Sequence, residues 1–252
     1  MRAIILAAGE GTRLRPYTNY LPKCLVSIEG VSTLELQLKL FSKYLIDPII
    51  VGGYLADAIK KFSNNLVINK DYASTNMLYT LFEARNFFDE DIIISYGDIA
   101  YSDNTLKALI EDKEEISLTI DKNWKEYWSK RYDNPLDDLE TLLINEGKVI
   151  EIGGKPSSYD NIQGQFMGLL KISKTKIDLI KSIYDECCDL GLINNKNYKK
   201  AYMTDFLQEL IGRGITIKAV EINDPWIEID SVSDYKNPET LKRVKKIIKM
   251  NS

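Results

Sequence analysis

Continuous apolar runs alternate with segments of helical periodicity along the first hundred residues, and this alternation limits the folds open to the chain. Apolar runs occupy residues 3–7, 48–53, 66–69 and 91–96, and residues 33–45 between the first two carry leucine and phenylalanine at helical spacing. Strands buried on both faces are continuously apolar in this way. The pattern predicts an α/β fold with a Rossmann-like mixed, mostly parallel sheet covered by helices on both faces.

The section after residue 121 changes character and predicts a small β element inserted into this fold. Two short candidate strands within 141–152 are separated by the turn dipeptide Glu146-Gly147. No repeat, low-complexity segment or Pro/Gly-rich linker divides the chain. We therefore expect one domain over residues 1–252, with an acceptor-binding insertion at about 122–165.

Local capping signals place the starts of two expected helices. Ser32 and Glu35 have the spacing of a capping box, which starts a helix near residue 33. Asn237 and Pro238 are an N-cap and first-turn pair for a C-terminal helix. The other expected elements are helices near 54–63, 74–87, 174–189 and 203–213, and strands at 116–121, 166–172 and 215–222.

The 252-residue chain contains no histidine, and this excludes every mechanism that needs imidazole. Ser-His-Asp and Cys-His nucleophilic systems, HExxH zinc sites and H-x-G-H nucleotidyltransferases are ruled out. The chemistry must use carboxylates, lysine, arginine, hydroxyls or metal. With 33 basic against 37 acidic residues and a net charge of -4, neither nucleic acid nor a membrane surface is expected as a partner.

Cysteine usage and the apolar runs predict a cytoplasmic protein. Cys24, Cys187 and Cys188 are the only cysteines, and they form neither a disulfide framework nor a metal-ligand pattern. No apolar run approaches the roughly 18 residues that span a bilayer, and Gly9 interrupts the first run, which is typical of a buried strand and not of a signal peptide. The sequence leaves the oligomeric state open, a homodimer included.

The first strand runs directly into LAAGEGTRLRPYTNYLPK at 6–23, which has the composition of an anion-binding loop. Its small residues let backbone N–H groups approach an anion, and Arg13, Arg15 and Lys23 add positive charge. No GKS or GKT follows, as a Walker loop requires, and Leu14 occupies the third glycine position of the dinucleotide fingerprint. A glycine pair alone is most often only a turn, but these surroundings favour a polyphosphate ligand.

Carboxylates follow apolar strands at two places in the sequence. Asp98 comes just after the run at 91–96, at the carboxyl end of a parallel strand, where open α/β sheets bind ligands. Glu228 and Asp230 alternate with two isoleucines, so both carboxylates lie on one face of an extended segment. Taken alone, Asp98 also fits a turn or helix cap, and the other pair a solvated strand face.

The segment LAAGEGTRL, with LPK downstream, resembles the signature loop of the sugar-phosphate nucleotidyltransferase superfamily, which moves a nucleotidyl group from an NTP to a phosphorylated acceptor and releases pyrophosphate. The resemblance implies that Arg13 contacts the leaving β and γ phosphates and that Lys23 contacts the α-phosphate. It also implies that Asp98 and Asp230 bind Mg²⁺. The nucleotide-binding residues that it implies are Leu6, Ala7, Ala8, Gly9, Glu10, Gly11, Thr12, Asn76 and Gly97.

This chemistry agrees with a chain that lacks histidine. A phosphomonoester has a second pKa of about 6, so the acceptor is a dianion near neutral pH and needs no general base. The reaction needs in-line positioning, Mg²⁺ and cations, which Arg13, Lys23, Asp98 and Asp230 are expected to supply. A non-catalytic nucleotide-sensing subunit is the alternative from another class, but it would be expected to have lost one of these four residues.

Three further segments resemble the cytidylyltransferase branch of this superfamily: residues 69–81, 124–140 and 228–235. That branch includes bacterial phosphocholine cytidylyltransferases and the phosphoglutamine cytidylyltransferase of capsule phosphoramidate synthesis. The resemblance implies transfer of CMP from CTP to phosphoglutamine first or phosphocholine second, for cell-surface polysaccharide modification, with Asn76 near the base or ribose. The alternative is a sugar 1-phosphate acceptor with UTP or dTTP, which usually comes with a longer insertion.

Aromatic residues and an arginine recur at i, i+3, i+4 and i+7 from Trp124, and this spacing has two interpretations. It is typical of a helix stripe that faces the core. It also suits an acceptor pocket, in which aromatic faces hold an ammonium and Arg131 pairs with a carboxylate or phosphate. The mixed set slightly favours an amino-acid phosphate. The acceptor-binding candidates are Trp124, Trp128, Arg131, Glu140 and Glu228.

Overall fold

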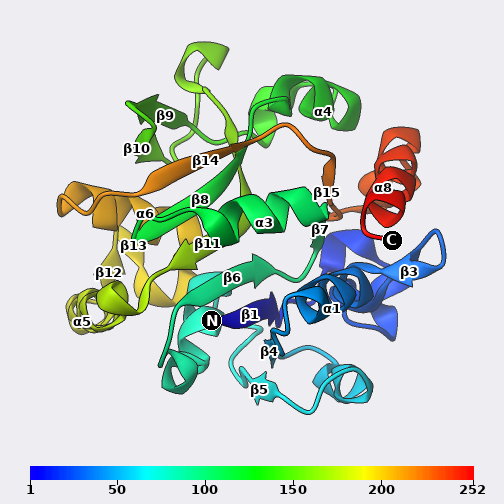
Figure 1. The fold of residues 1–252 in the computed structure, drawn as a ribbon, viewed down its shortest axis with the longest axis horizontal. Helices are drawn as coiled ribbons and strands as arrows, with labels where there is room; N and C mark the ends of the chain where they lie inside the picture. The colour runs from blue at the N-terminus through cyan, green and yellow to red at the C-terminus, as the bar shows by residue number, and fades with distance from the viewer.

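A nine-stranded sheet runs through the centre of the computed structural model, which describes residues 1–252 (Figure 1). Only β11 and β10 run against the other strands, because each pairs antiparallel with both of its neighbours. The predicted mixed, mostly parallel sheet is therefore confirmed. The strand order is β5 (Leu66–Ile68), β4 (Ile49–Gly52), β1 (Arg2–Ala7), β6 (Ile92–Tyr96), β11 (Gln165–Ile172), β8 (Ile116–Asp121), β14 (Lys218–Ile222), β10 (Lys148–Ile152) and β9 (Leu142–Asn145).

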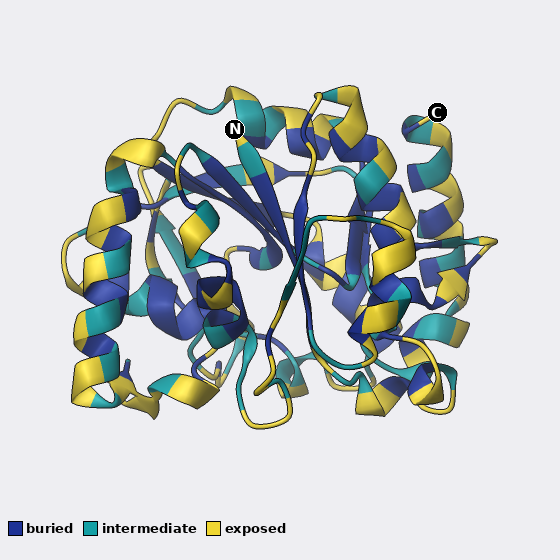
Figure 2. Ribbon diagram, turned by 90° about the horizontal axis from the view of Figure 1, so that it is seen from below, coloured by how far each residue is buried: buried dark blue, intermediate teal, exposed yellow.

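Alternate residues of the central strands feed two separate hydrophobic cores. Ile4 and Leu6 of β1 belong to one core, and Ala3 and Ile5 belong to the other, because successive side chains of a strand point to opposite faces. Figure 2 shows the buried strands between two groups of helices that expose their outer sides. One face carries α2 (Met77–Glu83), α5 (Lys174–Leu190) and α6 (Met203–Gly212), and the other carries α1 (Thr33–Lys43), α3 (Asp103–Glu111) and α4 (Trp124–Arg131).

A third, smaller core lies under the C-terminal helix and joins two distant parts of the chain. β7 (Ile99–Tyr101) pairs antiparallel with β15 (Trp226–Glu228) outside the main sheet. Ile227 and Ile229 pack in this core with apolar residues of α8 (Pro238–Met250). This pairing places the residues that precede β7 beside those that follow β15, which the sequence pattern did not indicate.

The inserted β element joins the edge of the main sheet. β9 and β10 form the predicted hairpin, with Glu146 and Gly147 at φ values of 48° and 73°, as a type I′ turn requires. β10 then pairs with β14. The remaining strands and α-helix are β2 (Ser27–Ile28) with β3 (Val31–Ser32), β12 (Leu192–Ile193) with β13 (Lys196–Asn197), and α7 (Val232–Lys236).

Three expected elements differ from the structure. The helix expected near 54–63 is a 3-10 helix over Ala56–Lys61, whose buried residues Ala56 and Ile59 lie three apart, the period of that helix. The helix expected over 74–87 is the shorter α2, since the Asn76 side chain accepts a hydrogen bond from the N–H of Met77 and caps it there. The strand expected from residue 215 begins at Lys218. No helix combines the length and apolar character needed to cross a bilayer.

The predicted capping box at the start of α1 is formed. Ser32 Oγ accepts a hydrogen bond from the Glu35 N–H at 3.2 Å, and the Ser32 N–H donates to Glu35 Oε2 at 2.8 Å. We expect Ser32→Ala to lower the free energy of unfolding by about 1 kcal/mol, because the helix loses its N-cap. Urea denaturation measures this. Ser42→Ala, at the exposed end of the same helix, is the control, and an equal loss in both variants would contradict the prediction.

Candidate active site

A cleft of about 590 Å³ lies at the carboxyl ends of β1 and β6, the edge at which α/β sheets bind ligands. Glu10 does not line it and instead pairs with Arg15 at 3.2 Å. Trp124 and Arg131 do not line it either. The predicted site residues that do line the cleft are Leu6, Ala7, Ala8, Gly9, Gly11, Thr12, Arg13, Lys23, Asn76, Gly97, Asp98, Trp128, Glu140, Glu228 and Asp230.

The loop after β1 forms one wall of the cleft and is held in shape by its own residues. Gly11 has a φ of 60°, in the left-handed region that favours glycine, and a Cβ there would lie 3.0 Å from the Cβ of Lys23. Thr18 Oγ1 donates a hydrogen bond to the Gly11 carbonyl at 2.8 Å. The loop therefore brings Arg13 and Lys23 to the cleft on a fixed backbone.

Side chains of α1 hold the turn that carries Asp98. The buried Gln37 donates from Nε2 to the carbonyls of Tyr96 and Ile99, at 2.8 and 2.7 Å, and Thr33 Oγ1 donates to the Gly97 carbonyl at 2.7 Å. A Cβ on Gly97 would lie 2.7 Å from the Leu6 carbonyl oxygen, so only glycine fits this close approach between β1 and β6. Asp98 is thus placed by hydrogen bonds to the backbone on both sides of it.

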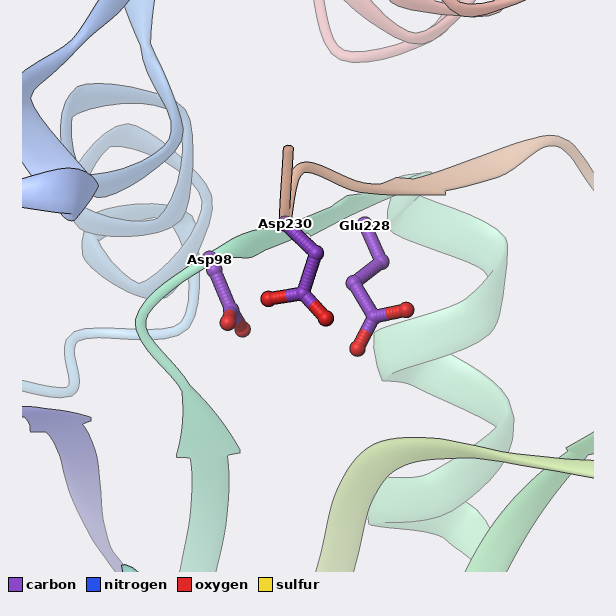
Figure 3. A group of neighbouring side chains, drawn as sticks. All are labelled: Asp98, Glu228 and Asp230. Carbon is purple, nitrogen blue, oxygen red and sulfur yellow. The ribbon is translucent and has the colours of Figure 1, made fainter. Parts of the chain in front are cut away.

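Three carboxylates meet at the floor of the cleft. Asp98, Glu228 and Asp230 each offer an oxygen within 4.8 Å of the others, and Figure 3 shows their side chains directed to the same side. The Ile229 N–H donates to the Asp98 carbonyl at 3.1 Å and fixes the two segments together. Ile227 and Ile229 are buried, so the predicted division into a carboxylate face and an isoleucine face is confirmed. The structure adds Glu228, expected at the acceptor, to the two aspartates.

Two cations neutralise this cluster from the side of the glycine loop. Lys23 Nζ lies 2.6 Å from Asp98 Oδ2 and also pairs with Asp230, while Arg13 Nη2 lies 2.7 Å from Asp230 Oδ2. Burial alone would lower the pKa of Lys23, but the two aspartates raise it above its ordinary value. Burial alone would raise the pKa of Asp230, but Lys23 and Arg13 hold this pKa below its ordinary value. The pKa of Glu228 is raised by burial and by the Asp230 carboxylate.

The carboxylate cluster fits a hard divalent cation. Its donors are all carboxylate oxygens, the ligands that Mg²⁺ prefers. Asp98 Oδ1 is buried and has no hydrogen-bond partner, which is costly for a charged group unless a cation binds it. The three side chains therefore have both the chemistry and an unsatisfied oxygen suited to such an ion.

The far part of the cleft is acidic and aromatic. Trp128 Nε1 donates to Asp138 Oδ2 at 3.0 Å, and Thr204 Oγ1 donates to Glu140 Oε1 at 3.2 Å. Burial raises the pKa of Glu140 to about 7. No lysine or arginine other than Arg13 and Lys23 lines the cleft. The lining residues that the sequence did not indicate are Cys24, Tyr72, Thr75, Met77, Thr80, Tyr96, Asp138, Gln165, Phe166, Tyr202 and Thr204.

Some of these residues had a signal in the sequence and others had none. Asp138 lies two residues before Glu140, in the stretch already assigned to the acceptor. Tyr202 is the N-cap residue of α6, and its N–H donates to Asp205 Oδ2 at 2.8 Å. The helix expected over 203–213 already placed a helix start beside it. That this helix start faces the cleft depends on packing, which local sequence does not encode.

The expectation that Trp124 and Arg131 contact an acceptor disagrees with the structure. The side chain of Arg131 is 0% exposed and pairs with Glu228 and Asp234. Trp124 packs in the core, with its ring centroid 5.8 Å from that of Tyr159. α4 turns its aromatic stripe inward, so the core interpretation holds for these residues, and only Trp128 at the end of the stripe reaches the cleft.

Comparison with known proteins agrees with this geometry. Residues 3–143 match the family described as MobA-like NTP transferase domain. The chain is 41% identical over 246 residues to a CTP:phosphoglutamine cytidylyltransferase from Campylobacter jejuni subsp. jejuni serotype O:2, covering 93% of this chain and 97% of that protein. It is 26% identical over 241 residues to a choline-phosphate cytidylyltransferase from Haemophilus influenzae, covering 93% and 94%.

The fold also has a close match among solved structures. The inositol-1-phosphate CTP transferase from T. maritima superposes with a TM-score of 0.76 at 22% identity, covering 98% of this chain and 95% of that one. The resemblance to cytidylyltransferases that the sequence motifs indicated is confirmed. The chain therefore belongs to the MobA-like NTP transferase family and is a nucleotidyltransferase.

Proposed function

We propose that this chain transfers CMP from CTP to a small phosphorylated amine or amino acid, with phosphoglutamine as the first candidate and phosphocholine as the second. One observation carries the proposal of nucleotidyl transfer: a glycine loop bears Arg13 and Lys23, which pair with Asp98 and Asp230 of the three-carboxylate cluster. The choice of CTP and acceptor is supported by the relative that is 41% identical over nearly its whole length.

The proposed reaction is an in-line displacement at phosphorus. An oxygen of the acceptor phosphate forms a bond to the α-phosphorus of CTP, and the bond from that phosphorus to the oxygen bridging to the β-phosphate breaks. Pyrophosphate leaves with the electron pair. The acceptor phosphate has a second pKa of about 6 and arrives as a dianion, so the absence of histidine removes nothing that the reaction needs.

Each charged residue of the cleft has a role in this proposal. The backbone of residues 8–11 binds the nucleotide, Arg13 holds the β and γ phosphates, and Lys23 neutralises the α-phosphate. The raised pKa of Lys23 keeps it cationic for this task. Asp98, Glu228 and Asp230 would hold Mg²⁺, which when bound neutralises charge on the phosphate oxygens. Asn76, at the start of α2, lies at the cleft wall and is proposed to contact the base or ribose.

The acceptor is proposed to place its cationic nitrogen in the far part of the cleft, within the insertion at about 122–165. Asp138 and Glu140 offer carboxylates there, and Trp128 offers an aromatic face, the combination that binds ammonium groups. A sugar 1-phosphate has no cation for these groups. With Arg131 buried, the argument from an arginine for a carboxylate-bearing acceptor lapses, and phosphoglutamine stands first because of the related enzyme. We place the reaction in the cytoplasm and in cell-surface polysaccharide modification.

A substrate panel tests the proposal. Pyrophosphate release is measured for CTP, UTP, dTTP and ATP, each with phosphoglutamine, phosphocholine, 2-aminoethylphosphonate and glucose 1-phosphate. We expect the highest kcat/KM for CTP with phosphoglutamine, followed by CTP with phosphocholine. Preference for UTP or dTTP with glucose 1-phosphate would replace the proposed function by the sugar alternative, and nucleotide binding without release in any pair would favour a sensing subunit.

Removal of one carboxylate from the cluster tests its place in the reaction. Asp98→Asn keeps the size of the side chain but removes its charge, and we expect kcat to fall by roughly 1,000-fold, equivalent to several kcal/mol of charge stabilisation. Asp103→Asn on α3, outside the cleft, is the control and should keep wild-type turnover. Comparable turnover in Asp98→Asn and wild type, with both folded by circular dichroism, would remove Asp98 from the mechanism.

The pKa of Glu140 near 7 predicts a pH effect on acceptor binding. Burial and the nearby Asp138 and Asp205 raise this pKa, whereas Thr204 and Lys196 oppose the rise. Glu140 is therefore neutral below about pH 7 and ionised above it. If the ionised form binds the acceptor ammonium, the wild-type KM for acceptor falls as pH rises through this value.

Glu140→Gln isolates this effect from the titration of the acceptor phosphate, which both proteins share. At pH 8 the variant should show an acceptor KM about tenfold above wild type, the value of one charge-assisted contact. At pH 6 the two KM values should converge, with little change in the KM for CTP at either pH. Parallel pH profiles for the two proteins would show that Glu140 does not contact the cationic end of the acceptor.

A further inference from the structure

The guanidinium of Arg131 occupies a closed position behind the cleft. Its side chain is 0% exposed. The rings of Tyr127, Trp128 and Tyr132 surround it, with centroids 5.1, 5.1 and 5.2 Å from Cζ. Because no atom of Arg131 lines the cleft, a substrate has no direct access to this charge. Arg131 can therefore affect the reaction only by positioning the residues that it contacts.

Arg131 touches two carboxylates of the segment that closes the cleft floor. Its Nε donates to Asp234 Oδ1 at 2.9 Å, and Nη1 and Nη2 donate to Glu228 Oε2 at 3.3 and 3.2 Å. The second contact engages only Oε2 of Glu228, so Oε1 makes no hydrogen bond to Arg131. Arg131 therefore orients one member of the cluster directly.

Asp234 links Arg131 to Asp230, the second member of the cluster. Its Oδ2 accepts hydrogen bonds from the N–H groups of Asp230 and Ser231, at 3.2 and 3.0 Å, and from Ser231 Oγ at 2.8 Å. One oxygen of Asp234 is thus bound to Arg131 and the other to the turn that carries Asp230. A continuous chain of hydrogen bonds therefore leads from Arg131 on α4 through Asp234 to the backbone of Asp230 and Ser231.

The same helix contacts this segment a second time. Tyr127, one turn before Arg131 on α4, accepts a hydrogen bond from the Glu228 N–H at 3.3 Å through its hydroxyl. Backbone and side chain of Glu228 are therefore both held by α4. A buried ion pair adds little stability compared with well-packed apolar side chains, so the distinctive contribution of the planar guanidinium is the geometry that it imposes.

We propose that Arg131 is a positioning residue, which sets the Glu228 carboxylate and the Asp230 turn in the arrangement that binds the divalent cation. The effect on catalysis depends on the proposed nucleotidyl transfer. The contacts of Arg131 with Glu228 and Asp234 do not depend on which substrates bind. Groups that orient metal ligands from behind have measurable effects, since their loss typically costs about 10- to 100-fold in metal affinity or activity.

The test measures Mn²⁺ binding to the full-length protein without substrates, by electron paramagnetic resonance, together with kcat and the KM values for CTP and acceptor. We expect Arg131→Met to weaken Mn²⁺ binding by about 10- to 100-fold and to lower kcat, with the acceptor KM unchanged. Asp234→Asn should do the same to a smaller extent, because Arg131 stays in place. Arg131→Lys should recover part of the loss, since it keeps the charge without the fork.

Lys130→Met is the matched control. Lys130 neighbours Arg131 on α4 but pairs with Glu126 and Glu239, away from the cluster, so its loss should leave Mn²⁺ binding and turnover at wild-type values. If Arg131→Met does not fold, Asp234→Asn and Arg131→Lys decide the question.

Three results would overturn the proposal. The first is wild-type Mn²⁺ affinity in folded Arg131→Met or Asp234→Asn. The second is a raised acceptor KM with unchanged Mn²⁺ binding, which would restore Arg131 as an acceptor residue. The third is a wild-type protein that binds no Mn²⁺. A wild type that binds Mn²⁺ but does not turn over CTP would instead contradict the proposed function, and the metal affinities of the variants would still decide the role of Arg131.

Discussion

The crowding of three carboxylates is the constraint on which the rest of the site depends. Two like charges about 4 Å apart repel by about 4 kcal/mol at an effective dielectric constant of 20, so a cluster within 4.8 Å needs cations around it. The structure supplies them from two sides. Lys23 and Arg13 approach from the cleft, where phosphates can compete for them, whereas Arg131 approaches from the core and stays bound. Substrates can therefore redistribute charge on one side of the cluster while the other side remains fixed.

The fold positions this cluster by joining segments that are distant in sequence. Pairing of β7 with β15 sets Asp98 beside the residues around Asp230, and the small core under α8 buries Ile227 and Ile229, which alternate with the two carboxylates. On the opposite side, Gln37 and Thr33 of α1 hold the turn after β6. The backbone that carries each acid is thus held by hydrogen bonds or by apolar packing on the side away from the cleft. Such support is what the proposed cation site requires.

Local sequence predicted the mostly parallel sheet and the shared face of Glu228 and Asp230, because apolar runs and period-two alternation are local properties. The grouping of Asp98 with Asp230 was implied by the family resemblance and not by local pattern. Local sequence did not predict that β11 would run antiparallel between β6 and β8, since a strand buried on both faces looks the same in either direction. The prediction that Arg131 contacts the acceptor was wrong for a similar reason. Helical spacing from Trp124 to Arg131 showed that these residues share a face of α4, but not whether the core or the cleft covers that face. The decisive partner, Asp234, lies 103 residues away.

The charged side chains that line the cleft determine which ligands it can bind. Its lining has five carboxyl groups, on Asp98, Asp138, Glu140, Glu228 and Asp230, against the cations of Arg13 and Lys23. The pKa values of Glu140 and Glu228 are raised, so the other three supply most of the negative charge near neutral pH. A polyphosphate is disfavoured by such a surface unless a cation enters with it, so nucleotide and divalent cation should bind cooperatively at the floor. The acids of the far part, Asp138 and Glu140, lie where a cationic acceptor would balance them in the same way. Since the chain has no histidine, its carboxyl groups determine how the charge of this cleft changes near neutral pH. The cleft is negatively charged without ligands, and a divalent cation and a cationic acceptor would neutralise it.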